Sequence, residues 1–142
     1  MTVGQILDEK GAKVVTVAPD QTVLEVTRVL TEHHIGAALI MDGETIAGVL
    51  SERDIVRCIA AKGPEALMKP ASELMTRTVI TCRRSDDIAR VMAQMTKGRF
   101  RHVPVVENGQ LIGLVSIGDV VKRRIAETEH EAEALREYIA TG

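Results

Sequence analysis

The sequence predicts an α/β (α+β-like) fold made of two tandem repeats, and three observations support this prediction. Residues 14–56 align with residues 79–121 over 43 positions without a gap, and eight of those positions are identical. Both segments show the same order of extended and helical patterns. Each is too small to cover both faces of its own sheet. We therefore expect two repeats packed sheet-to-sheet about a pseudo-twofold axis, with two inter-repeat clefts suited to small molecules.

The first repeat alternates helical and extended patterns. Apolar residues at helical spacing predict a lead-in helix at residues 2–9, and a β-branched run predicts a strand at residues 14–17. Asp20 is the expected cap of the next helix. The remaining elements are, in order, strands at 35–41 and 46–50 joined by an Asp-Gly turn, and a helix from Glu52 to Gly63-Pro64.

The second repeat predicts the same order. Ser85 is the expected helix cap, with Asp86 and Asp87 in the first turn, where the helix dipole favours negative charge. The other elements are, in order, a short helix at 72–75, strands at 79–82, 100–106 and 111–115, and a helix from Ile117 to about Ala140. The predicted domains are a first repeat with its lead-in helix at 1–66, a second repeat at 67–124, and a C-terminal helical extension at 125–142.

Composition and charge argue against several classes of function. Apolar residues make up 45% of the chain, but one Phe, one Tyr and no Trp give no base-stacking surface for single-stranded nucleic acid. The net charge of −2 provides no overall attraction to nucleic acid or to a membrane. No apolar run reaches the ~20 residues of a membrane span, and no signal-peptide pattern begins the chain. Cys58 and Cys82 have neither metal-ligand nor redox spacing, so we expect reduced cysteines in a cytoplasmic protein.

One phrase, Gly-x-x-Ser-x-x-Asp, occurs in both repeats, and two interpretations of it are open. In a capping box, Ser51 or Ser116 caps a helix and the acid three residues later bonds back to the cap. Alternatively, Asp54 and Asp119 accept hydrogen bonds from paired sugar hydroxyls, while the serine hydroxyl and free N–H groups suit a phosphate or sugar oxygen. The two roles are compatible, so the motif alone does not decide between them.

The chain resembles a pair of CBS domains, the regulatory modules named after cystathionine β-synthase. The features that carry the resemblance are the duplication, the two Gly-h-h-Ser-x-x-Asp-h phrases, the strand Arg101-His102-Val103-Pro104-Val105 and the lead-in Val3-x-x-Ile6-Leu7. They recur in the right order and cover about Thr2 to Arg124.

The resemblance implies a β-α-β-β-α unit in each half and adenosine-containing ligands such as AMP, ADP, ATP, NAD(H) or S-adenosylmethionine. It also implies roles for residues at matching positions. Ribose falls on Asp54, Asp119, Ser51 and Ser116; the base pocket on Thr16 and Thr81; and phosphate on Arg99, Arg101 and His102.

The two repeats differ in charge. Residues 77–101 hold seven Lys or Arg and two acids, whereas the matching residues 12–36 hold two basic residues and three acids. We therefore expect phosphate binding to depend mainly on the basic cluster of the second repeat, with Arg53 compensating in part in the first. The alternative is that this cluster is an ordinary solvated surface.

Nothing in the sequence forms a catalytic constellation. No nucleophile motif, metal-ligand cluster or Gly-rich phosphate loop is present, so we predict that the chain is not an enzyme, with no metal site and no catalytic cofactor. The leading hypothesis is a stand-alone nucleotide sensor whose occupancy is transmitted to an effector protein. The alternative is an interaction or dimerisation scaffold with vestigial clefts, and RNA binding is disfavoured.

A homodimer is a separate expectation. CBS pairs commonly associate into a disc of four repeats. The last helix also carries an apolar stripe at alternating steps of three and four residues, like a short coiled-coil seam: Ile125, Thr128, Ala132, Leu135 and Ile139. The alternative is that this stripe packs on the chain's own first helix.

Overall fold

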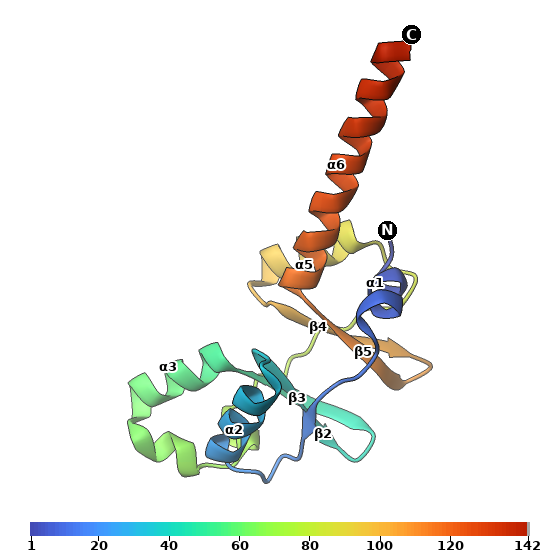
Figure 1. Cartoon of the computed structure of the whole chain (residues 1–142). Helices are drawn as coiled ribbons and strands as arrows, with labels where there is room; N and C mark the ends of the chain where they lie inside the picture. Colours follow the sequence, from blue (N-terminus) through green and yellow to red (C-terminus); the bar gives the residue numbers. More distant parts are fainter. Residues whose placement is uncertain (142) are drawn as a thin grey trace. The chain divides into compact units, whose positions relative to one another are not determined.

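The computed structural model describes residues 1–141 and divides into two compact units. Unit 1 comprises Met1–Lys13 and Ile80–Gly142, and unit 2 comprises Val14–Val79. Each unit contains one small sheet and several helices (Figure 1). The α/β class is thus confirmed, whereas sheet-to-sheet packing of the repeats stays a prediction.

Unit 2 contains a three-stranded sheet in the order β1-β2-β3. Strand β1 runs parallel to β2, and β2 and β3 form an antiparallel hairpin. The elements of unit 2 are β1 (Thr16–Val17), α2 (Val23–His33), β2 (Ala37–Asp42), β3 (Thr45–Ser51), α3 (Glu52–Lys62), the 3₁₀ helix η1 (Pro64–Met68) and α4 (Ala71–Leu74).

Unit 1 contains an antiparallel hairpin of two strands, β4 and β5. Its core combines residues of the N-terminal helix with residues that follow position 80, including Leu7, Val91 and Val115, which are fully or almost fully buried. The elements of unit 1 are α1 (Val3–Lys10), α5 (Ile88–Gly98), β4 (His102–Glu107), β5 (Gln110–Ser116) and α6 (Ile117–Thr141).

The two hairpins share one register. Every residue pair of the β4–β5 ladder is displaced by 65 positions from a pair of the β2–β3 ladder, beginning with Ala37↔Ser51 and His102↔Ser116. Both ladders shift register at the same place, after Ile40 and after Val105. The ungapped duplication in the sequence is therefore a duplication of backbone geometry.

The lead-in segments are exchanged between the repeats. Helix α1 precedes the first repeat in the sequence but belongs to unit 1, where the N–H groups of Val3 and Gly4 donate to the carbonyls of Asp86 and Arg84. Helix α4 precedes the second repeat but belongs to unit 2, where the N–H of Ala71 donates to the carbonyl of Gln21. The compact units therefore differ from the division at residue 66 that sequence order suggests.

Three local expectations need correction. Residues 79–82 do not form a strand; only Cys82 makes an isolated bridge, to Val105. The cap of α2 is Thr22 rather than Asp20, and the cap of α5 is Asp87 rather than Ser85. For both helices, a polar side chain two residues after the expected one accepts the hydrogen bond from a helix N–H group.

A glycine in each returning strand allows the lead-in segment to approach closely. A Cβ added at Gly113 would lie 2.7 Å from Cδ2 of Leu7, in α1. A Cβ added at Gly48 would lie 2.7 Å from both the Met75 Sδ and the Thr76 carbonyl oxygen. These distances are shorter than ordinary van der Waals contacts. A methyl group at Gly113 would displace the end of the Leu7 side chain, whereas one at Gly48 would meet a backbone carbonyl, so the requirement for glycine is stricter at Gly48.

We expect Gly48→Ala to destabilise the protein by about 1–3 kcal/mol, because the added methyl overlaps a backbone carbonyl that cannot move alone. Gly118→Ala is the control, since its Cβ would lie 3.6 Å from the Ser116 Oγ and alanine favours a helix. Chemical denaturation of both variants measures the difference. Equal stabilities of the two variants would show that the close approach at Gly48 is not required.

Candidate functional site

In unit 2, the repeated phrase forms a complete capping box at the start of α3. The Ser51 Oγ accepts from the N–H of Asp54 at 3.1 Å. In return, Oδ2 of Asp54 accepts from the N–H of Ser51 at 3.1 Å and from its hydroxyl at 2.9 Å. The capping interpretation is therefore correct for this copy, and the cap bonds fall on one carboxylate oxygen.

In unit 1, the same box forms at the start of α6 and gains a further partner. The Ser116 Oγ accepts from the N–H of Asp119 at 3.2 Å, and Oδ2 of Asp119 accepts from the N–H of Ser116 at 2.9 Å. The Lys10 ammonium also donates to this Oδ2, at 2.7 Å, and to the carbonyl of Leu114 at 2.9 Å. The second copy is thus a cap and an ion pair at once.

These contacts set the protonation of Asp119. Partial burial raises the pKa of its carboxyl, but the hydrogen bonds from Lys10 and Ser116 and the charge of Lys10 outweigh this effect. The pKa of Asp119 therefore lies below its usual value, and the carboxylate is ionised at neutral pH.

The predicted phosphate residues lie near this helix start to different degrees. The carbonyl of Arg101 accepts from the N–H of Ile117 at 2.8 Å, and His102 pairs with Ser116 across the hairpin. Arg99 is the left-handed C-cap residue of α5 and is exposed. Arg53 is exposed on the first turn of α3, in unit 2. Unit 1 therefore brings the Arg101 backbone and His102 beside Ser116, while Arg99 stands at the preceding helix end.

The two predicted base-pocket threonines are exposed beside the first strand of each hairpin. Thr16 pairs with Leu39 of β2 in parallel. Thr81 precedes Cys82, whose N–H donates to the carbonyl of Pro104 at 2.9 Å. Leu39 lies two positions along β2 from Ala37, which pairs with Ser51. Each threonine belongs to the same unit as the corresponding serine.

Lys10 is the residue that the sequence interpretation missed. It lies in the last turn of α1, 109 positions before Asp119. The sequence shows a basic residue at the end of the lead-in helix. It does not show that this helix packs in unit 1, beside Asp119.

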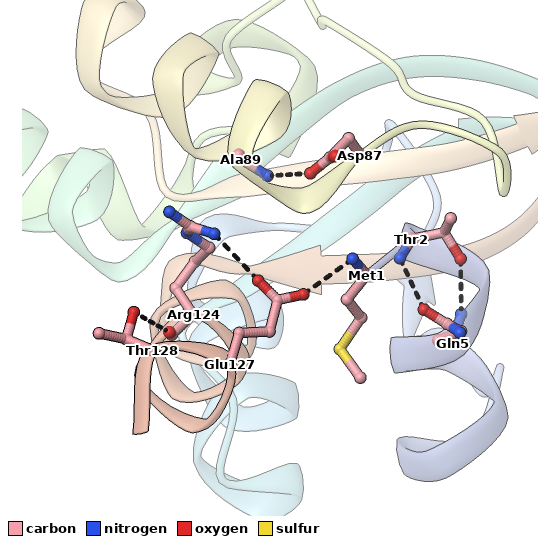
Figure 2. Close-up of polar contacts among 8 residues, drawn as sticks. All are labelled: Met1, Thr2, Gln5, Asp87, Ala89, Arg124, Glu127 and Thr128. Carbon is pink, nitrogen blue, oxygen red and sulfur yellow. Dashed lines mark hydrogen bonds and ion pairs between the residues drawn. The ribbon is translucent and has the colours of Figure 1, made fainter. Parts of the chain in front are cut away.

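Helix α1 is held against α6 at its N-terminal end as well (Figure 2). The Met1 ammonium lies 2.8 Å from Glu127, which also accepts from Arg124 at 2.9 Å. At the other end of α1, Glu9 forms an ion pair with Arg123. Lys10 is therefore carried by a helix that is fixed along its length.

The cysteines and possible metal ligands add no further site. Cys82 is buried, and burial raises the pKa of its thiol to about 12, so it stays protonated at neutral pH. Within residues 1–141, no group of three or more His, Cys, Asp or Glu is placed to hold a metal ion. Across the same residues, no helix combines the length and hydropathy that crossing a bilayer requires.

Comparison with known proteins identifies the family. The CBS domain family model matches residues 3–61 and again residues 71–126. The chain belongs to the CBS domain family. It is 31% identical over 150 residues to the mitochondrial CBS domain-containing protein CBSX3 of Arabidopsis thaliana, a match that covers 99% of this chain and 73% of that protein.

Solved structures of CBS proteins have the same fold. The CBS-domain containing protein ATU1752 of Agrobacterium tumefaciens has a TM-score of 0.85 at 44% identity, covering 87% of this chain and 99% of that one. The CBS protein PAE2072 of Pyrobaculum aerophilum, complexed with AMP, has a TM-score of 0.74 at 28% identity, covering 84% and 89%. The CBS pair of protein MJ0100, in complex with 5′-methylthioadenosine and S-adenosyl-L-methionine, has a TM-score of 0.79 at 25% identity, covering 89% and 98%.

We expect the Lys10–Asp119 pair to contribute about 0.5–1 kcal/mol to stability at neutral pH, because both side chains remain partly exposed. The folded-state pKa of Asp119 is depressed, so this contribution is present above the unfolded-state pKa of about 4 and is lost as the pH falls through the folded value. Chemical denaturation of the parent and of Lys10→Gln between pH 7 and pH 3 measures it.

Lys122→Gln is the matched control, since it removes the same charge from an exposed position on α6. The stability difference between the parent and Lys10→Gln should shrink below pH 4, and that for Lys122→Gln should change little. A difference for Lys10→Gln that is as large at pH 3 as at pH 7 would contradict the ion pair.

Proposed function

We propose that this chain is a regulatory CBS pair that binds adenosine-containing ligands at the two Ser-x-x-Asp helix starts. The observation that carries the proposal is that two CBS proteins of the same fold are complexed with ligands that share adenosine, AMP in one and S-adenosyl-L-methionine with 5′-methylthioadenosine in the other. The shared moiety requires a group that recognises ribose and base, whatever the 5′ substituent is. AMP, ADP, ATP and NAD(H) all carry it.

The geometry of the capping boxes supports a ribose role for Asp54 and Asp119. Each box uses Oδ2 for the cap, which leaves Oδ1 outside the box to accept from sugar hydroxyls. Ser51 and Ser116 lie at the same helix starts, whose N–H groups favour oxygen-rich ligands. We assign Thr16 and Thr81 to the base, and Arg53, Arg99, Arg101 and His102 to phosphate.

In this proposal the chain is a sensor and not an enzyme. Ligand binding affects an effector protein only if one arrangement of the chain binds the ligand better than another. The second candidate is a scaffold, favoured by the finding that both Ser-x-x-Asp phrases form helix caps from the chain's own atoms. Ligand binding separates the two functions.

We expect at least one of AMP, ADP, ATP, NAD⁺, NADH and S-adenosylmethionine to raise the thermal midpoint of the protein. A ligand at a hundred times its Kd stabilises the folded state by about 2.7 kcal/mol, a shift of several degrees in a thermal melt. Asp54→Ala and Asp119→Ala should lower or abolish that shift. A flat response across the panel would favour the scaffold.

Thr22→Ala separates a lost cap from a lost ligand. Thr22 caps α2 by accepting from the N–H of Glu25 at 3.1 Å and lies outside the proposed site. All three alanine variants should lose about 1 kcal/mol of stability without ligand. Only the two aspartate variants should also lose the ligand shift. If Thr22→Ala loses the shift to the same extent, the aspartates act through helix stability alone.

We further propose that two copies of the chain associate through the distal part of α6. This helix extends well beyond the rest of unit 1 (Figure 1). The seam residues Ile125, Leu135 and Ile139 are 54%, 59% and 69% exposed, so the stripe is not covered by α1. With Ile125 at position a of a heptad, a parallel pair would place Arg124 opposite Glu129 and Glu131 opposite Arg136, both attractive.

We expect the parent chain to be dimeric in light scattering at micromolar concentration and Leu135→Glu to shift it toward monomer. Ala140→Glu, on the same helix but off the seam, is the control. A monomeric parent would remove the dimer proposal. A dimer that survives Leu135→Glu would place the contact elsewhere.

A further inference from the structure

Lys10 makes the helix start of unit 1 chemically different from that of unit 2. Its ammonium bonds the Asp119 carboxylate and the Leu114 carbonyl, yet its side chain remains 37% exposed. The lysine is therefore not sealed beneath other groups. A ligand that reaches Asp119 meets a carboxylate whose negative charge is already balanced.

The length of α1 places the lysine there. Leu7 packs on Gly113, and the helix continues for almost one more turn to Lys10. Gly11 follows with a φ of 92° and ends the helix, its N–H bonding the carbonyl of Leu7 at 2.8 Å. Lys10 is thus the last helical residue and lies where β5 leads into α6.

In unit 2 the corresponding lead-in segment has a different structure. Helix α4 has four residues, and Met75 after it is extended, so no further helical turn follows. Instead, Thr76 and Val49 exchange both backbone hydrogen bonds, at 3.0 and 2.9 Å. Val49 is the repeat counterpart of Leu114. The Val49 carbonyl accepts a hydrogen bond from the backbone N–H of Thr76, whereas the Leu114 carbonyl accepts one from the Lys10 ammonium.

As a result, the surroundings of Asp54 differ from those of Asp119. Its capping bonds come from Ser51, and among residues 1–141 no lysine or arginine forms an ion pair with it. Aligning Val3-x-x-Ile6-Leu7 with Ala71-x-x-Leu74-Met75 puts Thr78 at the position of Lys10. The uncompensated carboxylate of Asp54 and the neutralised pair at Asp119 would therefore meet a charged ligand differently.

The presence or absence of a lysine beside the aspartate should affect how well the 5′ substituent of the ligand is tolerated. Ribose hydroxyls donate to a carboxylate equally well in neutral and in anionic ligands, but a phosphate on the same ribose is repelled by an uncompensated carboxylate. The Lys10 ammonium cancels this repulsion at Asp119. The backbone of Arg101, bonded to the first N–H of α6, brings a second cationic residue to the same helix start.

We infer that Lys10 is a specificity-determining residue, which makes Asp119 the preferred position for anionic adenosine ligands such as AMP. Asp54, where the exposed Arg53 is the proposed phosphate contact, prefers them less. This inference rests on the proposed function, because it assumes that ribose binds at these acids. It adds the charge class of the ligand at each acid.

The test compares AMP with adenosine, which differ only in the phosphate. Calorimetric Kd values are measured in the Asp54→Asn background, where Asp119 is the remaining ribose acid, with and without Lys10→Gln. The ratio of the adenosine Kd to the AMP Kd should fall about fivefold in Lys10→Gln, as expected for a charge contact near the surface. Lys10→Arg should retain most of the ratio, and Lys122→Gln should leave it unchanged.

Each other outcome overturns the inference in a distinct way. An unchanged ratio in Lys10→Gln, with lower stability, would make the lysine a strand-edge contact only. If Lys10→Gln binds AMP and adenosine more tightly by the same factor, Lys10 competes with the ribose for Asp119. Binding by the parent that disappears in the Asp54→Asn background would show that Asp119 alone holds no ligand. If the parent binds no adenosine-containing ligand at all, the proposed function fails, and this inference fails with it.

Discussion

The packing of a lead-in segment against the glycine of a returning strand determines the geometry of each unit. Leu7 occupies the space that a side chain at Gly113 would fill, and Met75 with Thr76 does the same at Gly48. Because the contact is so close, the segment also reaches the exposed edge of the strand and satisfies its backbone groups. The helix that follows each strand begins only a few residues later, so the same contact decides what lies beside its first turn.

Much of this geometry could be predicted from the sequence because it is local or repeated. The predicted strands and the Asp-Gly turn place the first hairpin, and the ungapped duplication carries its register to the second. The spacing of Ser51 and Asp54 contains all the information that a capping box requires. Both capping boxes, whose partners lie three positions apart, are therefore identified correctly.

The failures concern choices between competing partners. Periodicity shows that Val3, Ile6 and Leu7 share a helix face, but it does not show which sheet that face covers, so the exchange of lead-in segments was missed. The Lys10–Asp119 contact depends on that exchange and spans 109 positions. The caps of α2 and α5 failed for a simpler reason. Several capping side chains stand in one short run, and the position at which the backbone turns helical selects among them.

The helix cap and the proposed ligand role reinforce each other physically. A carboxylate that is held by a serine N–H on one oxygen has lost most of its rotamer freedom before any ligand arrives, so the entropy cost of fixing it on binding is reduced. As a consequence Oδ2 is already in use, and among residues 1–141 the Oδ2 of Asp119, in unit 1, also accepts from a lysine while that of Asp54 does not. A difference of one helical turn between α1 and α4 thus gives two repeats of one motif different electrostatic surroundings. The two copies of the motif therefore differ in their surroundings although the Ser-x-x-Asp phrase is the same in both.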